Sequence, residues 1–283
     1  MELFDEGLHS GVNLALNVER VIYREKTDLQ DLVIFENSQF GRVMSLDGAI
    51  QTTENDEFIY HEMFVHVPLL AHGKARRVLV IGGGDGGAAR QLMKHKNIAV
   101  TLVDIDRTVI ELSKKYMPSV SGGAFDDPRL ELVIADGCQF VKETDARWDV
   151  IVIDSTDPHG PGEVLYTEEF YGDCKSCLSE GGIIITQNGV PFVQENELRE
   201  SYDRLGRLFK DVTFYLAAIP SYVGGVMAYG WATDETGHRR ADLAKLAQRY
   251  IDAEIETEYY TPEVHQAAFA LPLHIQKMLT RER

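Results

Sequence analysis

Short β-type runs characterise the first 54 residues of the chain. They lie at Val12 to Tyr23, Leu29 to Glu36, Arg42 to Leu46 and Ala49 to Thr52, and turn-forming pairs such as Asp47-Gly48 separate them. This pattern predicts a small antiparallel β domain over residues 1–54. The next segment, Asp56 to Ala71, is rich in apolar and aromatic residues and predicts a helix that ends at His72-Gly73.

From Arg77 onward, apolar runs alternate with amphipathic segments. The apolar runs are Val78 to Ile81, Ile98 to Val103, Leu130 to Ile134, Val150 to Ile153 and Ile183 to Thr186. Such alternation is typical of βαβ units that form a parallel sheet with helices on both faces. Two later β-type runs, Val212 to Ile219 and Val226 to Ala232, precede a helical tail from about Arg239. We therefore expect an α/β catalytic domain over residues 55–283, packed directly on the β domain because no repeat or Pro-rich linker separates them.

A glycine-rich turn follows the first apolar strand of this second part. Gly82, Gly84 and Gly87 have the G-x-G-x-x-G spacing of dinucleotide sites, and a helix is expected from Ala88 to His95. Asp104 ends the next strand about 20 residues later, where a carboxylate can bind the two ribose hydroxyls of a nucleotide or nucleoside.

Asp85 lies inside the glycine turn and separates the candidate ligands. A pyrophosphate would sit against the same turn, and two unit charges about 4 Å apart interact by roughly 4 kcal/mol at an effective dielectric of 20. The carboxylate thus disfavours NAD, unless it points to solvent and merely caps the helix. Asp136 ends the third strand, where it either accepts a hydrogen bond from an adenine amino group or caps the next helix.

The fourth strand also ends in acidic residues, within Asp154-Ser155-Thr156-Asp157-Pro158. Sites of open α/β sheets lie at the carboxyl ends of the strands, beside the topological switch where strands one and four meet. We therefore expect Asp154 and Asp157 to lie beside the Asp85 loop, although either residue could instead serve a turn or a cap.

Composition narrows the functional classes. The chain has 28 basic and 45 acidic residues and a formal net charge of −17, which disfavours nucleic acid and anionic membrane surfaces as partners. The N-terminus lacks the pattern of a secretory signal, and no apolar stretch reaches about 18 residues. Three cysteines do not form a disulfide framework. These features predict a cytoplasmic protein.

The chain resembles the bacterial spermidine synthases, or polyamine aminopropyltransferases, over almost its whole length. The motifs that carry this resemblance are Gln30-Asp31-Leu32-Val33-Ile34-Phe35, Leu46-Asp47-Gly48-Ala49-Ile50-Gln51, Asp56-Glu57-Phe58-Ile59-Tyr60-His61-Glu62-Met63, the Gly82 to Gly87 loop, Asp154 to Pro161, and Ile219-Pro220-Ser221-Tyr222. The resemblance implies a methyltransferase-like Rossmann domain with a small N-terminal β domain, and a homodimer or homotetramer. It also implies transfer of the aminopropyl group of decarboxylated S-adenosylmethionine, a co-substrate, to putrescine or a related diamine, with methylthioadenosine as product. No permanently bound cofactor and no metal are expected.

The resemblance also assigns roles to residues. It implies that Asp154 is the general base and that Asp85 holds the amine of the aminopropyl group. The implied adenosine contacts are Gln30, Asp104, Asp136, Gly137 and Pro161, together with Gly82 and Gly84 of the loop; the implied acceptor contacts are Tyr60, His61, Ser155, Asp157, Gln187 and Tyr222. The family commonly has Glu where this chain has Asp104, so the ribose contact is expected to be longer or mediated by water.

Several alternatives stay open at this point. An S-adenosylmethionine-dependent methyltransferase for small amines shares the fold, but Asp85 argues against the carboxylate of intact cofactor. An inactive polyamine- or nucleoside-binding protein would keep the pocket without needing a base. His61 and His66 are five residues apart, so roughly 140° separates them around a helix and zinc binding is disfavoured. The choice among putrescine, cadaverine, diaminopropane and agmatine also stays open.

Overall fold

The N-terminal part of the chain is built from β-strands. A computed structural model describes residues 2–9, 11–27, 29–158 and 160–280. For residues 160 and 161 it describes the backbone alone. β1 (Glu2–His9) and β2 (Val12–Val18) form an antiparallel hairpin, and β3 (Arg20–Lys26), β4 (Asp31–Asn37), β5 (Gly41–Leu46) and β6 (Ala49–Thr53) form an antiparallel four-stranded sheet. The expected single run from Val12 to Tyr23 is wrong, because the chain bends at Glu19, and the sequence pattern missed β1 altogether.

The second part is a seven-stranded sheet in the order β12-β13-β11-β10-β7-β8-β9. Its strands are β7 (Arg77–Gly82), β8 (Ala99–Asp104), β9 (Leu130–Ile134), β10 (Trp148–Asp154), β11 (Leu178–Gln187), β12 (Asp211–Ala218) and β13 (Val226–Thr233). The five strands β7 to β11 are parallel to one another, whereas β13 is antiparallel to both β11 and β12. The expected methyltransferase-like α/β fold is confirmed, and β7 and β10 meet at the switch point as predicted.

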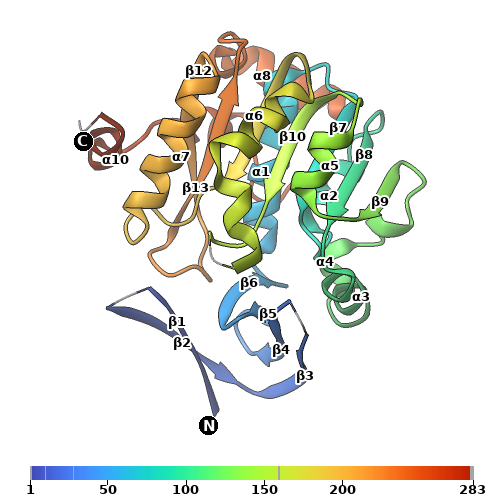
Figure 1. Ribbon diagram of the computed structural model, residues 1–283, viewed down its shortest axis with the longest axis vertical. Helices are drawn as coiled ribbons and strands as arrows, with labels where there is room; N and C mark the ends of the chain where they lie inside the picture. Colours follow the sequence, from blue (N-terminus) through green and yellow to red (C-terminus); the bar gives the residue numbers. More distant parts are fainter. Residues whose placement is uncertain (1, 10, 28, 159, 281–283) are drawn as a thin grey trace.

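Helices cover both faces of this sheet (Figure 1). One face packs against α1 (Glu57–His72), α2 (Gly87–Met93), α8 (Leu243–Ala253) and α9 (Pro262–Ala268), and the other against α5 (Gly137–Glu143), α6 (Glu168–Ser176) and α7 (Glu195–Leu208). In β7, for example, Val78 and Val80 join the first core while Leu79 and Ile81 join the second, as strand periodicity requires. α10 (Leu273–Thr280) lies against α7. The remaining described elements are α3 (Arg107–Tyr116), α4 (Pro118–Ser121) and three 3₁₀ segments, Ala124–Asp126, Gly160–Tyr166 and His238–Arg240.

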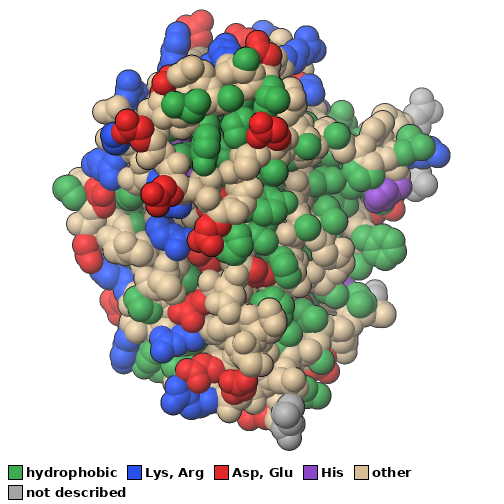
Figure 2. Space-filling model, turned by 180° about the vertical axis from the view of Figure 1, so that it is seen from behind, with side chains coloured by type: hydrophobic (Ala, Val, Ile, Leu, Met, Phe, Trp, Pro, Cys, Tyr) green, Lys and Arg blue, Asp and Glu red, His purple; other side chains and the backbone are tan. Residues whose placement is uncertain are grey.

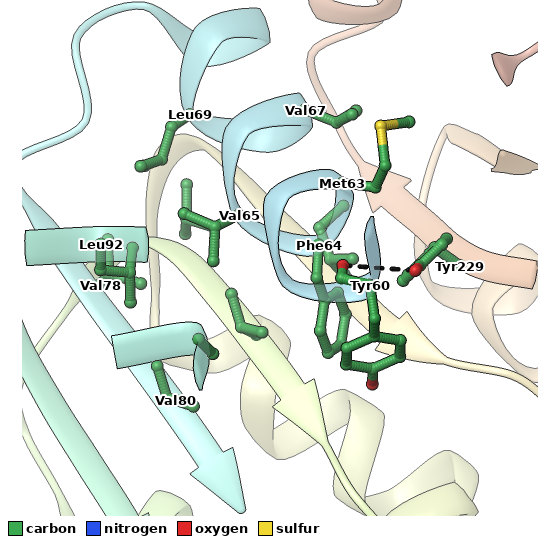
Figure 3. Packing of buried hydrophobic residues seen from close by; sticks show 14 of the residues in the cluster. Tyr60, Met63, Phe64, Val65, Val67, Leu69, Val78, Val80, Leu92 and Tyr229 are labelled. Atoms are coloured by element: carbon green, nitrogen blue, oxygen red, sulfur yellow. Dashed lines mark hydrogen bonds between the residues drawn. The ribbon is translucent and has the colours of Figure 1, made fainter. Parts of the chain in front are cut away.

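Helix α1 is buried on almost every side (Figure 3). Its side chains fill the space between the sheet and α2, where Val65 packs near Val78 and Leu92 in the same apolar cluster. The backbone carbonyl of Tyr60 accepts a hydrogen bond of 3.3 Å from the Tyr229 hydroxyl on β13. Tertiary packing therefore fixes the first turns of α1 against the large sheet.

The four-stranded sheet packs directly on the α/β part. Leu32, Ile34 and Met44 share an apolar cluster with Val109 and Leu112 of α3, all of them buried. This contact places the loops of the small sheet over the carboxyl ends of the large one, as Figure 1 shows for β6 below β7 and β10. Residues far apart in the sequence thereby meet in one cleft.

The surface carries charges of both signs. On the face in Figure 2, acidic and basic side chains are interspersed, and a band of hydrophobic side chains runs down its middle. Within the described ranges, no helix has the length and apolar character needed to cross a membrane.

Candidate active site

A cavity of about 730 Å³ lies between the small sheet and the carboxyl ends of the parallel strands. Acidic residues from several different elements line it, among them Glu6, Asp85, Asp104, Asp136, Asp154 and Asp157. All the residues assigned to the site from the sequence line this cavity except Pro161, whose side chain lies outside the part of the chain that the structure describes.

The glycine turn brings β7 close to β10. Gly82 has φ +82°, and a Cβ at this position would collide with the Asp154 carbonyl oxygen, so only glycine fits. The next amide, of Gly83, donates a hydrogen bond of 3.0 Å to that same oxygen. Gly87 is equally constrained, because the ring of His61 occupies the space of a side chain there. The turn therefore fixes the carboxyl end of β10 and makes room for His61.

Asp85 both caps the helix and faces the cavity. Its Oδ1 accepts a hydrogen bond of 2.8 Å from the Gly87 amide, and its Oδ2 lies 3.6 Å from His61 Nε2. Its side chain is 15% exposed and belongs to the cavity wall. The two interpretations of Asp85 considered from the sequence are thus compatible, because one carboxylate satisfies the helix terminus and still presents its charge to a ligand.

Asp154 ends β10 and receives a hydrogen bond of 2.7 Å from the Tyr60 hydroxyl to its Oδ1. The pKa of Asp154 is raised to about 6, chiefly by burial and also by the charges of Asp85 and Asp104, while His61 and the Tyr60 hydrogen bond oppose the shift. A carboxyl group with this pKa is mostly ionised at pH 7, yet it is a stronger base than an ordinary aspartate. It is therefore suited to accept a proton near neutral pH.

The other side of the cavity carries the residues assigned to adenosine. Burial raises the pKa of Asp104 to about 6, and its Oδ1 accepts a hydrogen bond of 2.8 Å from the Asp106 amide. Gln30, at the edge of the small sheet, donates from Nε2 to Asp106 Oδ2 at 2.7 Å. This bond links the two parts of the chain at the cavity wall.

Asp136 and Gly137 lie at the start of α5. Asp136 Oδ1 accepts a hydrogen bond of 2.8 Å from the Cys138 amide, so Asp136 caps this helix while also lining the cavity. Gly84 lies against the Asp104 carboxylate, and Gly137 lies against the Ile81 side chain. These close approaches leave no room for larger side chains at the two glycines.

A polar network connects the remaining candidates beyond Asp154. The Tyr166 hydroxyl donates to Gln187 Oε1 at 2.7 Å, and Gln187 Nε2 donates to Asp157 Oδ1 at 3.2 Å. Ser155 Oγ lies 3.1 Å from the same Tyr166 hydroxyl. Gln194 Nε2 also donates to Asp157 Oδ1, at 3.1 Å. The sequence interpretation missed Tyr166 and Gln194, which orient the predicted residues.

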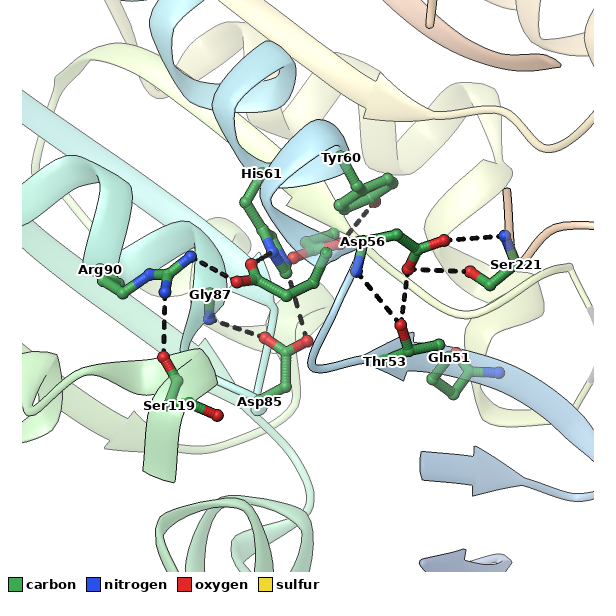
Figure 4. Close-up of polar contacts among 12 residues, drawn as sticks. Gln51, Thr53, Asp56, Tyr60, His61, Asp85, Gly87, Arg90, Ser119 and Ser221 are labelled. Atoms are coloured by element: carbon green, nitrogen blue, oxygen red, sulfur yellow. Dashed lines mark hydrogen bonds and ion pairs between the residues drawn. The ribbon is translucent and has the colours of Figure 1, made fainter. Parts of the chain in front are cut away.

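Tyr222 also lines the cavity. Its hydroxyl donates a hydrogen bond of 2.7 Å to the Gln51 carbonyl of the small sheet, and its ring makes an edge contact with the Tyr60 ring at 6.2 Å. Asp56 anchors the loop before Tyr222, because its Oδ2 accepts a hydrogen bond of 2.8 Å from the Ser221 amide (Figure 4). The small sheet, α1 and the β12–β13 loop thus form one wall.

Glu6 is the most unexpected residue of the cavity. It lies on β1, its side chain is buried, and its Oε1 accepts a hydrogen bond of 2.6 Å from the Ile50 amide. Burial raises the pKa of Glu6 to about 7, the Ile50 amide opposes this, and the charge of Asp157 adds to it. No sequence pattern identified Glu6, because β1 itself was not predicted.

His61 lines the cavity as predicted, but both of its ring nitrogens face carboxylates (Figure 4). Nδ1 lies 2.6 Å from Glu57 Oε2, and Nε2 lies 3.6 Å from Asp85 Oδ2. Although burial lowers its pKa, Asp85, Glu57 and Asp154 together raise the pKa of His61 to about 9. His66 points elsewhere, with its Nδ1 3.0 Å from His95 Nε2. Among the described residues, no group of three or more His, Cys, Asp or Glu is placed to bind a metal ion.

Comparisons with known families match both parts of the chain. A family model described as the spermine/spermidine synthase domain matches residues 57–242. A second, described as the spermidine synthase tetramerisation domain, matches residues 3–54.

Individual relatives are similar over nearly the full length. A polyamine aminopropyltransferase of Yersinia pseudotuberculosis is 53% identical over 280 residues, which cover 99% of this chain and 95% of the relative. Polyamine aminopropyltransferase 1 of Pseudomonas aeruginosa is 52% identical over 283 residues, which cover 100% and 99%.

The solved structures agree with the sequence relatives. A spermidine synthase in complex with the transition-state analogue AdoDATO superimposes with a TM-score of 0.93 at 39% identity, over 98% of this chain and 94% of that one. The spermidine synthase of Thermotoga maritima gives a TM-score of 0.89 at 37% identity, over the same shares of the two chains.

Proposed function

Since the chain belongs to the spermine/spermidine synthase family and is an aminopropyltransferase of this type, we propose that it transfers the aminopropyl group of decarboxylated S-adenosylmethionine to putrescine, giving spermidine and methylthioadenosine. The observation that carries this proposal is the placement of Asp85 in the glycine turn, where its carboxylate faces the same cavity as Asp154. A positively charged aminopropyl amine suits this position, whereas the carboxylate of intact S-adenosylmethionine would be repelled.

In the proposed reaction, a neutral amine of the diamine attacks the carbon of the aminopropyl chain that is bonded to sulfur. A carbon–nitrogen bond forms, the carbon–sulfur bond breaks, and its electron pair stays on sulfur to give methylthioadenosine. An alkyl amine with a pKa near 10.4 is mostly protonated at pH 7, so the neutral form costs about 4.6 kcal/mol. Asp154 offsets this cost by accepting the amine proton, while the Tyr60 hydroxyl keeps its carboxylate oriented.

We propose that the adenosine occupies the side of the cavity lined by Asp104 and Asp136. Asp104 binds the ribose hydroxyls, and Asp136 with Gly137 binds the adenine, alongside Gln30, Gly82, Gly84 and Pro161. Asp104 is one methylene shorter than the usual Glu. Its carboxylate already accepts the amides of Asp106 and Gly84, so the ribose hydroxyls would use its remaining lone pairs.

The acceptor diamine occupies the other side, in this proposal, between Tyr60, Tyr222, Ser155 and Asp157. Its distal ammonium lies toward Glu6, whose pKa of about 7 allows it to become ionised when a cation binds. His61 contributes to this wall through Asp85, and Gln187 through Asp157.

The assembly and location of the protein are further proposals. The match of residues 3–54 to a tetramerisation domain supports an oligomer, which we propose is a homodimer or a homotetramer. We also propose that residues 1–54 and 55–283 form its two domains and that the protein is cytoplasmic, with neither nucleic acid nor membrane as partner.

A mass-spectrometric assay tests the proposed reaction. Decarboxylated and intact S-adenosylmethionine are each offered with putrescine, cadaverine, diaminopropane and agmatine, and both methylthioadenosine and the alkylated amine are followed. We expect spermidine and equimolar methylthioadenosine from the decarboxylated cofactor with putrescine. Methylation from intact cofactor would overturn the proposal, and faster transfer to another diamine would correct the acceptor.

A further inference from the structure

The ring of His61 lies between two carboxylates at the first turn of α1 (Figure 4). Nδ1 is 2.6 Å from Glu57 Oε2 and Nε2 is 3.6 Å from Asp85 Oδ2, while only 3% of the His61 side chain is exposed. A neutral imidazole has one N–H and one lone pair, so one nitrogen would direct its lone pair at an anion. The geometry therefore favours the imidazolium, with a proton on each nitrogen.

Glu57 is itself held in place by a cation. Its Oε1 lies 2.5 Å from Arg90 Nη2 of α2, and Arg90 Nη1 donates to the Ser119 carbonyl at 2.9 Å. Only 4% of the Glu57 side chain is exposed, and a carboxylate buried to this degree needs a cation or a hydrogen-bond donor beside it. The i,i+4 spacing on α1 then aligns Glu57 with His61 on one face of the helix.

From these contacts we propose that Glu57, supported by Arg90, is a positioning residue that holds His61 as an imidazolium and thereby orients Asp85. The chain of contacts runs from Arg90 through Glu57 and His61 to Asp85, whose other oxygen is held by the Gly87 amide. The kinetic consequences of this proposal rest on the proposed function, whereas the protonation state of His61 does not.

The charges that face His61 agree with this role. They come from Glu57 on its own helix, Asp85 in the glycine turn and Asp154 at the end of β10; the neighbouring Tyr60 hydroxyl is directed at Asp154. Their sum raises the pKa of His61 to about 9 despite its burial. In return, His61 lowers the pKa of Asp154 against the effect of burial.

Removal of the Glu57 charge should therefore affect three other residues: His61, Asp154 and Asp85. His61 loses the closer of its two carboxylates, so its pKa falls and the neutral form appears near neutral pH. Asp154 then loses a neighbouring positive charge, so its pKa rises and less of the general base is ionised at pH 7. Asp85 keeps the Gly87 amide but loses its second partner.

The test compares Glu57→Gln with Glu62→Gln. Glu62 is the matched control because it is a buried glutamate on the same helix, but its carboxylate accepts the amides of Glu258, Tyr259 and Tyr260 instead. NMR titration of the His61 Cε1 resonance in the ligand-free protein should show a doubly protonated ring at pH 7 in the wild type. We expect the midpoint to fall by at least about one pH unit in Glu57→Gln and to stay unchanged in Glu62→Gln.

Kinetics supply the second readout. The acid limb of kcat/KM should move to higher pH in Glu57→Gln but not in Glu62→Gln. Glu57→Asp keeps the carboxylate, so its acid limb should lie closer to that of the wild type. This variant also serves as the folded substitute if Glu57→Gln unfolds. A neutral His61 in the wild type, or equal midpoints in wild type and Glu57→Gln, would overturn the proposal. A wild-type protein that transfers no aminopropyl group would refute the proposed function and leave the NMR test intact.

Discussion

Helix α1 carries two buried histidines whose pKa values are shifted in opposite directions. At the first turn, His61 is surrounded by carboxylates, and its pKa is raised to about 9. Further along the helix, His66 faces His95, and burial lowers the pKa of both, that of His95 to about 4. Burial is similar at the two places, so the neighbours decide the charge.

This difference separates the part of α1 that serves chemistry from the part that serves packing. The first turn gives its polar side chains to the cavity, where Tyr60 contacts Asp154 and His61 contacts Asp85. The later turns fill the core with apolar side chains such as Val65 (Figure 3). A buried charged group is tolerated only where neighbouring groups pair with it or hydrogen-bond to it.

The largest expected effect is on turnover when Asp154, the proposed general base beside the first turn of α1, is replaced. Asp154→Asn should lower turnover between about 10² and 10⁴-fold with near-normal cofactor binding, because the amide cannot accept the amine proton. Single-turnover kinetics and cofactor titration measure the two quantities. Asp149→Asn on the same strand, whose carboxylate accepts backbone amides of Arg76 and Arg77, should keep normal turnover. An unchanged rate in Asp154→Asn would remove Asp154 from the mechanism.

The His66–His95 pair, between α1 and the segment after α2, should make the fold less stable in acid. His95 has a folded pKa of about 4 against about 6.5 when unfolded, so the unfolded state binds more protons between these values. The free energy of unfolding should therefore fall by about 3 kcal/mol from this residue as the pH drops from 6.5 to 4. Urea titrations of His95→Gln should show a smaller loss over that window.

The control for this measurement is His274→Gln, which changes an exposed histidine on α10 and should leave the acid dependence as in the wild type. His61 acts in the opposite direction, because its folded pKa is raised: its contribution is fully present below about pH 6.5 and is lost as the pH rises through about 9. Equal acid slopes in wild type and His95→Gln would contradict the contrast between His61 and the His66–His95 pair.

A third prediction concerns the choice of cofactor. Asp85→Asn should reduce the preference for decarboxylated over intact S-adenosylmethionine by at least about 10-fold, because the amide no longer attracts the ammonium or repels the carboxylate. Competition titrations with the two cofactors give the ratio of dissociation constants. An undiminished ratio would mean that discrimination arises elsewhere in the cavity.

The smallest effect is expected for Tyr60→Phe. The Tyr60 hydroxyl lowers the pKa of Asp154 through its 2.7 Å hydrogen bond, so its loss should move the acid limb of kcat/KM up by about half a pH unit to one unit. Tyr229→Phe is the matched control, since that hydroxyl donates to the Tyr60 carbonyl and not to a carboxylate. Coincident pH profiles for Tyr60→Phe and wild type would exclude this role.

Much of the fold could be read from local patterns. The parallel strands were predicted because apolar runs such as Val78 to Ile81 are buried on both faces, and the glycine turn was predicted by its spacing. β1 escaped prediction because its alternation is weak: in Glu2–His9 only Glu6 is fully buried, and that residue is acidic and not apolar.

The sequence by itself determined which residue types stand at the ends of β7, β8 and β10, because strand periodicity and turn glycines are local properties. Only the tertiary structure decided what those residues do. Glu6 enters the cavity from a strand far from the sheet in sequence, and Arg90 of α2 forms an ion pair with Glu57 beside His61. Such effects depend on distances between separate elements and on the loss of solvent around them, and no local pattern records either quantity.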